Sequence, residues 1–160
     1  MIKLVILDID GVMTDGTKAY DDNHDVIFKT YCDRDFTSIK RLKAAGVSVC
    51  FLSGDKSINE MMAKKRKVDF YYSRQKEKTL YELLNKYKCA ITEAAYIGDD
   101  IYDLPVLKKV SYSFCPSNAP EDVKHHCKHV LSSKSGDSVV AEFYDVAVRK
   151  NLIERNMLGM

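Results

Sequence analysis

The sequence predicts an α/β protein built on a parallel sheet, and three observations support this fold class. First, the chain opens with an almost unbroken aliphatic run over residues 2–7, which is typical of a strand buried on both faces. Second, short β-prone runs alternate along the chain with apolar residues at helical spacing, as in parallel sheets with helical crossovers. Third, several of these runs end in polar clusters, and ligands of open α/β sheets bind beyond the carboxyl ends of the strands.

The individual elements follow from local patterns. Residues 17–31 carry a polar turn, Asp21-Asp22-Asn23, between two β-prone arms and predict a hairpin. Apolar residues from Phe36 to Leu42 have helical spacing, Gly46 ends that helix, and Ser57-Ile58-Asn59-Glu60 is a capping-box pattern that begins the next one. We expect strands at residues 2–7, 47–52, 68–72, 94–97, 112–115 and 129–131, and helices at 35–45, 57–66, 75–88, 104–108, 120–126 and 138–150. These elements make one domain over residues 1–150, followed by a mobile tail over residues 151–160.

Composition narrows the class of protein. The chain has 160 residues, 30% of them charged, and a net charge of +2, which gives no attraction to nucleic acid or to a membrane surface. Its five cysteines are scattered and form no CxxC pair, which favours reduced thiols in a cytoplasmic protein. The apolar run at the start is too short for a signal peptide and ends in acids. We therefore expect a cytoplasmic protein with neither a nucleic-acid nor a membrane partner.

Candidate chemistry collects where the strands end. Carboxylates gathered from different strands suit Mg²⁺, which takes oxygen ligands. A hydroxyl and a lysine beside them suit a phosphoryl group, whose negative charge needs hydrogen-bond donors and a cation. In such a site one aspartate can attack phosphorus and a second, two residues on, can transfer the proton. The residues that supply these groups are Asp8 and Asp10, Ser53, Asp99, Asp100 and Asp103, with the lysine pair Lys76 and Lys78 before the third helix.

These groups, in this order, resemble the four motifs of the haloacid dehalogenase superfamily. The two longest matches, DIDGVMTDG at residues 8–16 and AYIGDDIYDLPVL at residues 95–107, are similar to one branch that has no cap domain. That branch holds the 3-deoxy-D-manno-octulosonate 8-phosphate (Kdo-8-phosphate) phosphatases and the related nonulosonate 9-phosphate phosphatases. The resemblance extends over residues 2–143. It implies a Rossmann-like, haloacid dehalogenase-like sheet with a small hairpin flap.

The resemblance also implies a role for each matching residue. Asp8 would be the nucleophile and a Mg²⁺ ligand, and Asp10 the general acid and base, with its backbone carbonyl on the metal. Ser53 would hydrogen-bond the transferring phosphoryl group. Asp99 would be the third protein ligand of Mg²⁺, with Asp103 behind it and Asp100 a candidate for either position.

The lysine of the third motif is ambiguous at this level. Counting back from Gly98, together with the phase of the leucines that follow, favours Lys76, whereas counting forward from Asp69 favours Lys78. We prefer Lys76 and keep Lys78 as the alternative.

The substrate is less well defined than the reaction. Kdo-8-phosphate phosphatases usually carry arginine after the second motif, where this chain has Asp55-Lys56, and an acid there is more similar to the nonulosonate members. Arg34 and Lys56 could bind a sugar carboxylate, since arginine binds carboxylates in bidentate fashion, or could be solvent-facing cations beside helix starts. The substrate-binding residues that we infer are Thr14, Gly54, Arg34, Asp55 and Lys56.

The missing cap has a consequence for assembly. Only about twenty residues separate Asp10 from the first helix, so this segment can hold the hairpin and no cap domain. In the related branch such hairpins assemble a tetramer in which a neighbouring subunit closes the site. We therefore expect a homotetramer.

Three functions follow from these comparisons of motifs. The first is a Mg²⁺-dependent phosphatase that acts through an aspartyl-phosphate on a phosphorylated 2-keto-3-deoxy sugar acid, with Kdo-8-phosphate as the leading candidate. The second is a phosphatase for a nonulosonate 9-phosphate of the sialic acid or KDN type, or for another small sugar phosphate. The third is a non-catalytic haloacid dehalogenase-like domain that serves in assembly beside a cytidylyltransferase.

Overall fold

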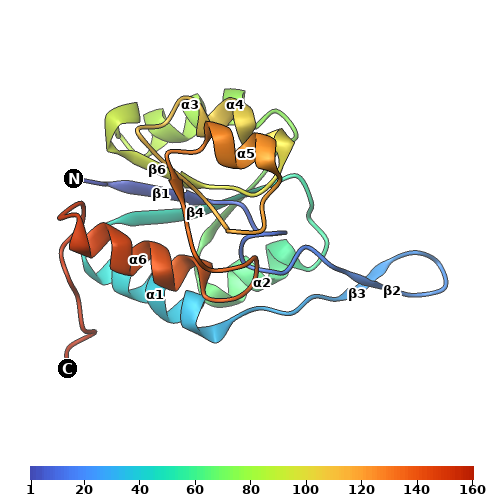
Figure 1. Cartoon of the computed structure of the whole chain (residues 1–160). Coiled ribbons are helices and arrows are strands. Elements are labelled where there is room, and N and C mark those ends of the chain that lie inside the picture. Colours follow the sequence, from blue (N-terminus) through green and yellow to red (C-terminus); the bar gives the residue numbers. More distant parts are fainter.

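The computed structural model describes all 160 residues and is built around one parallel sheet (Figure 1). Its six strands lie in the order β5-β4-β1-β6-β7-β8, so that the first strand of the chain is central. All four residues of β1 are buried because helices cover both faces of the sheet. The strands are β1 (Leu4–Leu7), β4 (Ser48–Ser53), β5 (Asp69–Tyr72), β6 (Ala94–Ile97), β7 (Tyr112–Cys115) and β8 (His129–Val130).

Two layers of helices cover the sheet, with α1, α2 and α6 on one face and α3, α4 and α5 on the other (Figure 1). Side chains of β1 alternate between them: Val5 and Leu7 join the larger apolar cluster, and Leu4 and Ile6 join the smaller one. The helices are α1 (Asp33–Ala44), α2 (Asn59–Arg66), α3 (Lys76–Lys86), α4 (Leu104–Leu107), α5 (Glu121–His126) and α6 (Val139–Arg149), with 3-10 turns at η1 (Ile91–Glu93) and η2 (Ile101–Asp103). None of these helices has the length and apolar character needed to cross a membrane.

The hairpin of β2 (Ala19–Tyr20) and β3 (Val26–Phe28) forms a separate two-stranded sheet that projects from the body (Figure 1). It is the only insertion between β1 and α1, so the predicted α/β fold with a hairpin flap and no cap domain is confirmed. Three of its apolar side chains, Tyr20, Ile27 and Phe28, are exposed.

The predicted helices and strands are all present, with ends that differ by one or two residues, but two local expectations are wrong. The capping box at Ser57 does not form. Helix α2 begins at Asn59, its N-cap Ile58 has a φ of 64°, and no side chain caps it. One cause is local, because the Ser57 N–H donates to the carboxylate of Asp55 two residues before it. The other is tertiary, because the side chain of Asn59 is buried in contact with Asp10 and Lys29.

The expected mobile tail is also corrected over much of its length. Ile153 is buried in the larger apolar cluster, and the Leu152 carbonyl accepts a hydrogen bond from the Ile2 N–H. Asn156 exchanges hydrogen bonds with the hydroxyl of Tyr144, and its carbonyl also accepts from the Arg41 side chain. This segment therefore packs beside α1 and α6, because its apolar residues complete the cluster beneath them.

Candidate active site

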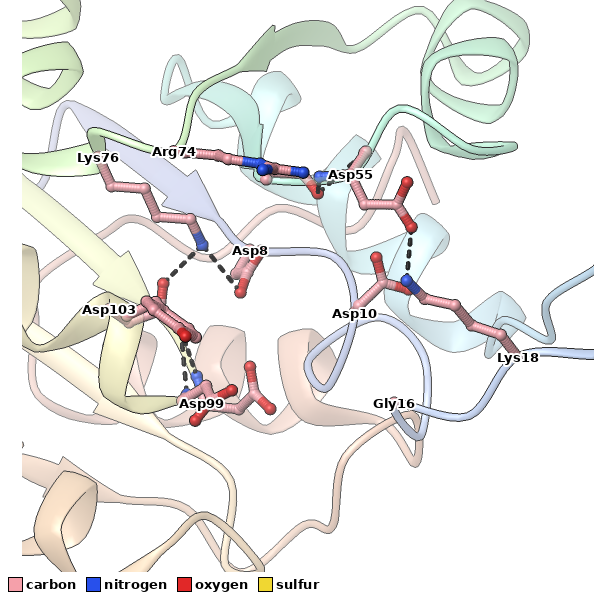
Figure 2. Close-up of a pocket in the computed structure, with 13 residues that line it drawn as sticks. Asp8, Asp10, Gly16, Lys18, Asp55, Arg74, Lys76, Asp99 and Asp103 are labelled. Carbon is pink, nitrogen blue, oxygen red and sulfur yellow. Dashed lines mark hydrogen bonds and ion pairs between the residues drawn. The ribbon is translucent and has the colours of Figure 1, made fainter. Parts of the chain in front are cut away.

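A polar cavity of about 530 Å³ opens at the carboxyl ends of β1, β4 and β6 (Figure 2). The parallel register brings the last residues of these strands side by side, with Leu7 opposite both Phe51 and Ile97. The side chains that follow each strand therefore point into one space. Its lining residues are Asp8, Asp10, Gly16, Lys18, Ser53, Gly54, Asp55, Arg74, Lys76, Asp99, Asp100, Tyr102 and Asp103.

A buried lysine joins two of the aspartates. Lys76, the first residue of α3, places its Nζ 3.0 Å from Oδ2 of Asp8 and 2.7 Å from Oδ1 of Asp103 (Figure 2). The hydroxyl of the buried Tyr96 also donates to Oδ1 of Asp103, at 2.5 Å. The other oxygen of Asp103 accepts the backbone N–H groups of Asp99 and Asp100. Both oxygens of Asp103 are thus already occupied by protein donors.

The burial of these charges shifts their titration. Desolvation, with the nearby charge of Asp103, raises the pKa of Asp8 well above its usual range, although Lys76 opposes this. Desolvation raises the pKa of Asp99 to about 7, with Asp103 and Asp100 adding to the effect. Burial works against the charge on Lys76, but the carboxylates of Asp8 and Asp103 still raise its pKa above the usual value. The cluster therefore holds more negative charge than Lys76 alone balances.

The same cluster fits a divalent cation. One oxygen each from Asp8, Asp99 and Asp103 lie within 4.8 Å of one another. Oδ1 of Asp99 is buried and has no hydrogen-bond partner in the protein, whereas Asp103 has no free oxygen. Asp99 is therefore the carboxylate with a free oxygen for a hard cation such as Mg²⁺. Asp8, whose oxygens accept the Ile9 N–H and contact Lys76, lies close enough to share that cation. A side chain at Gly11 would meet Oδ2 of Asp99 at 1.8 Å, so the glycine of the first motif permits this approach.

Asp10 belongs to a second network, on the β4 side of the cavity. Its Oδ2 accepts from Nδ2 of Asn59 at 2.9 Å, and Nζ of Lys29 lies 2.9 Å from its Oδ1. Lys29 also contacts Oδ2 of Asp55 at 3.0 Å, and Lys18 contacts the same oxygen at 2.6 Å. Although partial burial opposes it, hydrogen bonds from Lys18, the Ser57 N–H and Lys29 hold the pKa of Asp55 below its usual range.

Ser53, the last residue of β4, lies between these two networks. Its Oγ exchanges hydrogen bonds of 3.1 Å with the backbone of Asp55, and Nδ2 of Asn59 approaches it at 3.4 Å. These contacts hold the hydroxyl at the cavity wall, beside Gly54.

The structure separates the two lysines that the sequence left as alternatives. Lys76 contacts Asp8, whereas Lys78 is exposed and lines a neighbouring surface hollow on the far side of Arg74 and Tyr102. The difference arises because α3 begins at Lys76, so Lys78 lies on another side of its first turn.

Three of the inferred substrate-binding residues do not line the cavity. Thr14 is fully buried, and its hydroxyl accepts the N–H groups of Gly11 and Gly16, so it shapes the loop after β1. Arg34 is exposed in the first turn of α1. Lys56 is exposed as well, with its ammonium 4.9 Å from the ring centre of Tyr72. Gly54 and Asp55 do line the cavity, and Asp100 lies exposed at its edge, its carboxylate accepting the Ile101 N–H.

Sequence reasoning missed five polar residues of the site. Lys18 and Lys29 arrive from the two limbs of the hairpin, Asn59 from α2, Arg74 from the segment before α3, and Tyr102 from η2. Only Asn59 had a local signal, as an amide inside the supposed capping box. The others depend on how distant segments fold back over the sheet edge.

A buried aspartate paired with a lysine, beside a carboxylate with an unpartnered oxygen, lies at the sheet edge where a haloacid dehalogenase-like hydrolase is expected to have its active site. Residues 70–143 match the family model of the haloacid dehalogenase-like hydrolases. Over 154 residues the chain is 36% identical to the Kdo-8-phosphate phosphatase KdsC of Haemophilus influenzae, covering 92% of this chain and 83% of that protein. KdsC of Yersinia pestis is 31% identical, with 91% and 79% covered. The chain therefore belongs to the KdsC phosphatase family of the haloacid dehalogenase-like hydrolases.

Solved structures agree with this assignment. The cobalt-bound form of the Haemophilus influenzae phosphatase superposes with a TM-score of 0.88 at 35% identity, covering 92% of this chain and 88% of that one. The Moraxella catarrhalis Kdo-8-phosphate phosphatase, solved in complex with a magnesium ion, a phosphate ion and KDO, superposes with a TM-score of 0.86. At 22% identity, with 92% and 86% of the two chains covered, that second likeness shows the fold alone.

Proposed function

We propose that this protein is a Mg²⁺-dependent phosphatase that hydrolyses Kdo-8-phosphate through an aspartyl-phosphate on Asp8. The observation that carries the proposal is the position of Asp8, buried at the end of the central strand between Lys76 and the unpartnered oxygen of Asp99. The identity of 36% to a Kdo-8-phosphate phosphatase, over most of both chains, supports the substrate.

The residues of the cavity divide the reaction into two transfers. In the first, the Asp8 carboxylate forms a bond to phosphorus while the bond from phosphorus to the sugar oxygen breaks, and Asp10 gives that oxygen a proton. In the second, Asp10 takes a proton from water, the water oxygen bonds to phosphorus, and the Asp8 carboxylate leaves. Lys76 offsets the negative charge of the phosphoryl group, and the Ser53 hydroxyl donates a hydrogen bond to one of its oxygens. Mg²⁺, held by Asp8, Asp99 and the Asp10 carbonyl, would supply further positive charge to the phosphoryl oxygens.

Two cations at the cavity mouth suit the carboxylate of a sugar acid. Arg74 extends over the cavity from the segment before α3, and Lys18 faces it from the hairpin (Figure 2). Lys18 already contacts Asp55, but Arg74 forms no ion pair within the chain and is therefore the better candidate for a bidentate contact. The acid at position 55, which is more similar to the nonulosonate members, lines the cavity and is paired with Lys18 and Lys29, so the nonulosonate 9-phosphates stay in the test below.

The direct test is hydrolysis by the purified protein of Kdo-8-phosphate, two nonulosonate 9-phosphates and an aryl phosphate. We expect Mg²⁺-dependent release of phosphate with the highest kcat/KM for Kdo-8-phosphate, and loss of turnover after chelation of the metal. Asp8→Asn should abolish turnover, because an amide cannot attack phosphorus, whereas the exposed carboxylate of Asp33 can be removed as a control. Full activity of Asp8→Asn would contradict a mechanism through an aspartyl-phosphate on Asp8. A protein without any phosphatase activity would instead favour an assembly role.

We also propose a homotetrameric, cytoplasmic protein. The exposed Tyr20, Ile27 and Phe28 of the hairpin support assembly through this element, because the cavity has no cap of its own to exclude water. The five unpaired cysteines support a reducing compartment.

A further inference from the structure

Lys29, directly after β3, has a side chain that is 0% exposed, although it carries a charge. A buried ammonium is costly unless each of its donors finds an acceptor. Lys29 finds three acceptor side chains: Asp10, with Nζ 2.9 Å and 3.0 Å from the two oxygens, Asp55 at 3.0 Å and Asn59 at 3.1 Å. The three donors of Lys29 are therefore all used, and its position is fixed by two segments of the chain, the loop after β1 and the stretch from Asp55 to Asn59.

Asp10 depends on this arrangement. Its carboxylate is 20% exposed and lines the cavity, and two side chains form hydrogen bonds or ion pairs with it: Lys29 and Asn59. Asn59 is in turn held by Lys29 and by the hydroxyl of Tyr31, both of which donate to its Oδ1, so that its Nδ2 is directed at Asp10. Without Lys29, Asp10 would lose one donor directly, and the amide that provides the other would lose one of its own contacts.

We propose that Lys29 is a positioning residue for Asp10. It fixes the Asp10 carboxylate, directly and through Asn59, in the orientation from which Asp10 hands a proton to the departing sugar oxygen. This inference rests on the proposed function, because it assigns Lys29 a part in the proton transfer of that reaction. Lys29 does not touch the substrate; it acts through Asp10.

The simpler explanation is that Lys29 only fastens the hairpin to the body. The chain contains a matched residue for that role. Lys18, on the other limb of the hairpin, contacts the same Asp55 oxygen but not Asp10. A lysine that merely fastens the hairpin should therefore behave like Lys18, whereas a lysine that positions Asp10 should behave like a weakened Asp10.

The leaving group distinguishes these two explanations. Proton transfer from Asp10 is needed for a sugar alkoxide, which is a poor leaving group, and is dispensable for a dinitrophenolate, which is a good one. We would measure kcat/KM of wild type, Lys29→Met, Lys18→Met and Asp10→Asn on Kdo-8-phosphate, phenyl phosphate, nitrophenyl phosphate and dinitrophenyl phosphate. Lys29→Met should lose on the order of 10²-fold on the sugar phosphate and less than about threefold on dinitrophenyl phosphate, the pattern of Asp10→Asn in weaker form. The three aryl phosphates carry no carboxylate for Lys18 to bind, so Lys18→Met should change their kcat/KM values by similar factors, whereas Lys29→Met should change them increasingly as the leaving group becomes poorer.

A double variant completes the test. If Lys29 acts through Asp10, adding Lys29→Met to Asp10→Asn should cause little further loss on the sugar phosphate. Equal losses on every leaving group, or losses that add fully to those of Asp10→Asn, would overturn the proposal and leave Lys29 as a fastening residue. Should Lys29→Met not fold, Lys29→Arg carries the same test, since it keeps the charge but moves the donors. If the dependence of kcat/KM on the leaving group in Lys29→Arg equals that of wild type, the proposal is equally overturned.

These results are separable from the proposed function itself. The function fails if wild type shows no Mg²⁺-dependent turnover of any of the four substrates. The inference about Lys29 fails only on the ratio between leaving groups in a protein that is active.

Discussion

Asp8 and Asp10 lie two residues apart, yet each contacts a different buried lysine. Lys76 joins Asp8 to Asp103, and Lys29 joins Asp10 to Asp55. Two carboxylates this close in sequence would repel each other if they shared one environment, and separate cations let them hold different roles. The proposed division between a nucleophile and a proton carrier would thus depend on lysines from segments far from β1 in the sequence.

At the residue scale the two lysines of α3 give a matched pair. Lys76→Ala removes the only cation in contact with Asp8 and leaves Asp103 buried without its counter-charge. We expect a loss of kcat on the order of 10²–10³-fold, the usual effect of removing one donor to a developing charge. Lys78→Ala, two residues on and exposed, should keep kcat close to wild type. Steady-state kinetics on Kdo-8-phosphate with saturating Mg²⁺ measure both kcat values. A larger loss of kcat in Lys78→Ala than in Lys76→Ala would make Lys78 the phosphate-binding lysine.

At the scale of the elements, Asp35 connects two helices. It lies in the first turn of α1, is fully buried, and accepts the N–H of Ala141 in the first turn of α6, while its Oδ2 has no partner. Burial raises the pKa of Asp35 to about 6, even though N–H groups of α6 lower it. In the unfolded chain the same group titrates near its ordinary value, which is about 4. Between about pH 4 and pH 6, Asp35 is protonated in the folded protein but ionised in the unfolded chain. Proton binding to Asp35 therefore stabilises the folded protein at low pH, and this stabilisation is lost as the pH rises through that window.

Asp35→Asn should remove this dependence on pH. The variant carries a constant penalty for its altered contacts, so the quantity to compare is the difference in unfolding free energy between wild type and variant. As the pH rises from about 4 to 7, wild type should lose on the order of 2 kcal/mol of unfolding free energy relative to the variant. Urea unfolding at each pH measures it, with the exposed Asp145→Asn as the control. A difference that stays flat with pH would contradict a raised pKa for Asp35.

How far the sequence predicts the structure can also be judged from particular elements. The strands and the carboxylates after them were predictable, because the carboxyl ends of parallel strands meet at one edge. The start of α2 was not, since the local cap at Ser57 lost to the burial of Asn59 among Asp10, Ser53 and Lys29. Lys18, Lys29 and Arg74 were missed for a related reason. The sequence of a hairpin or a loop does not show which part of the sheet edge its cations will reach after folding.

At the scale of the whole molecule, the hairpin has two different ends. Its base carries Lys18 and Lys29, which contact the active-site carboxylates, whereas its strands expose Tyr20, Ile27 and Phe28 to solvent. A partner subunit that covers these apolar side chains would hold the hairpin, and with it the two lysines, in place. Assembly and the geometry around Asp10 are therefore expected to be linked.

This link gives a prediction for the oligomer. Light scattering should give wild type a mass about four times the 18.2 kDa of one chain, as the proposed tetramer requires. Ile27→Ser combined with Phe28→Ser should dissociate it, because removing apolar area weakens an interface that buries these side chains. Activity should fall in parallel, and should recover in part at high protein concentration. Met61→Ser, which removes an exposed apolar side chain on α2 instead, should change neither mass nor activity. A fully active monomer would show that the cavity needs no neighbour, and that the exposed hairpin residues have another purpose.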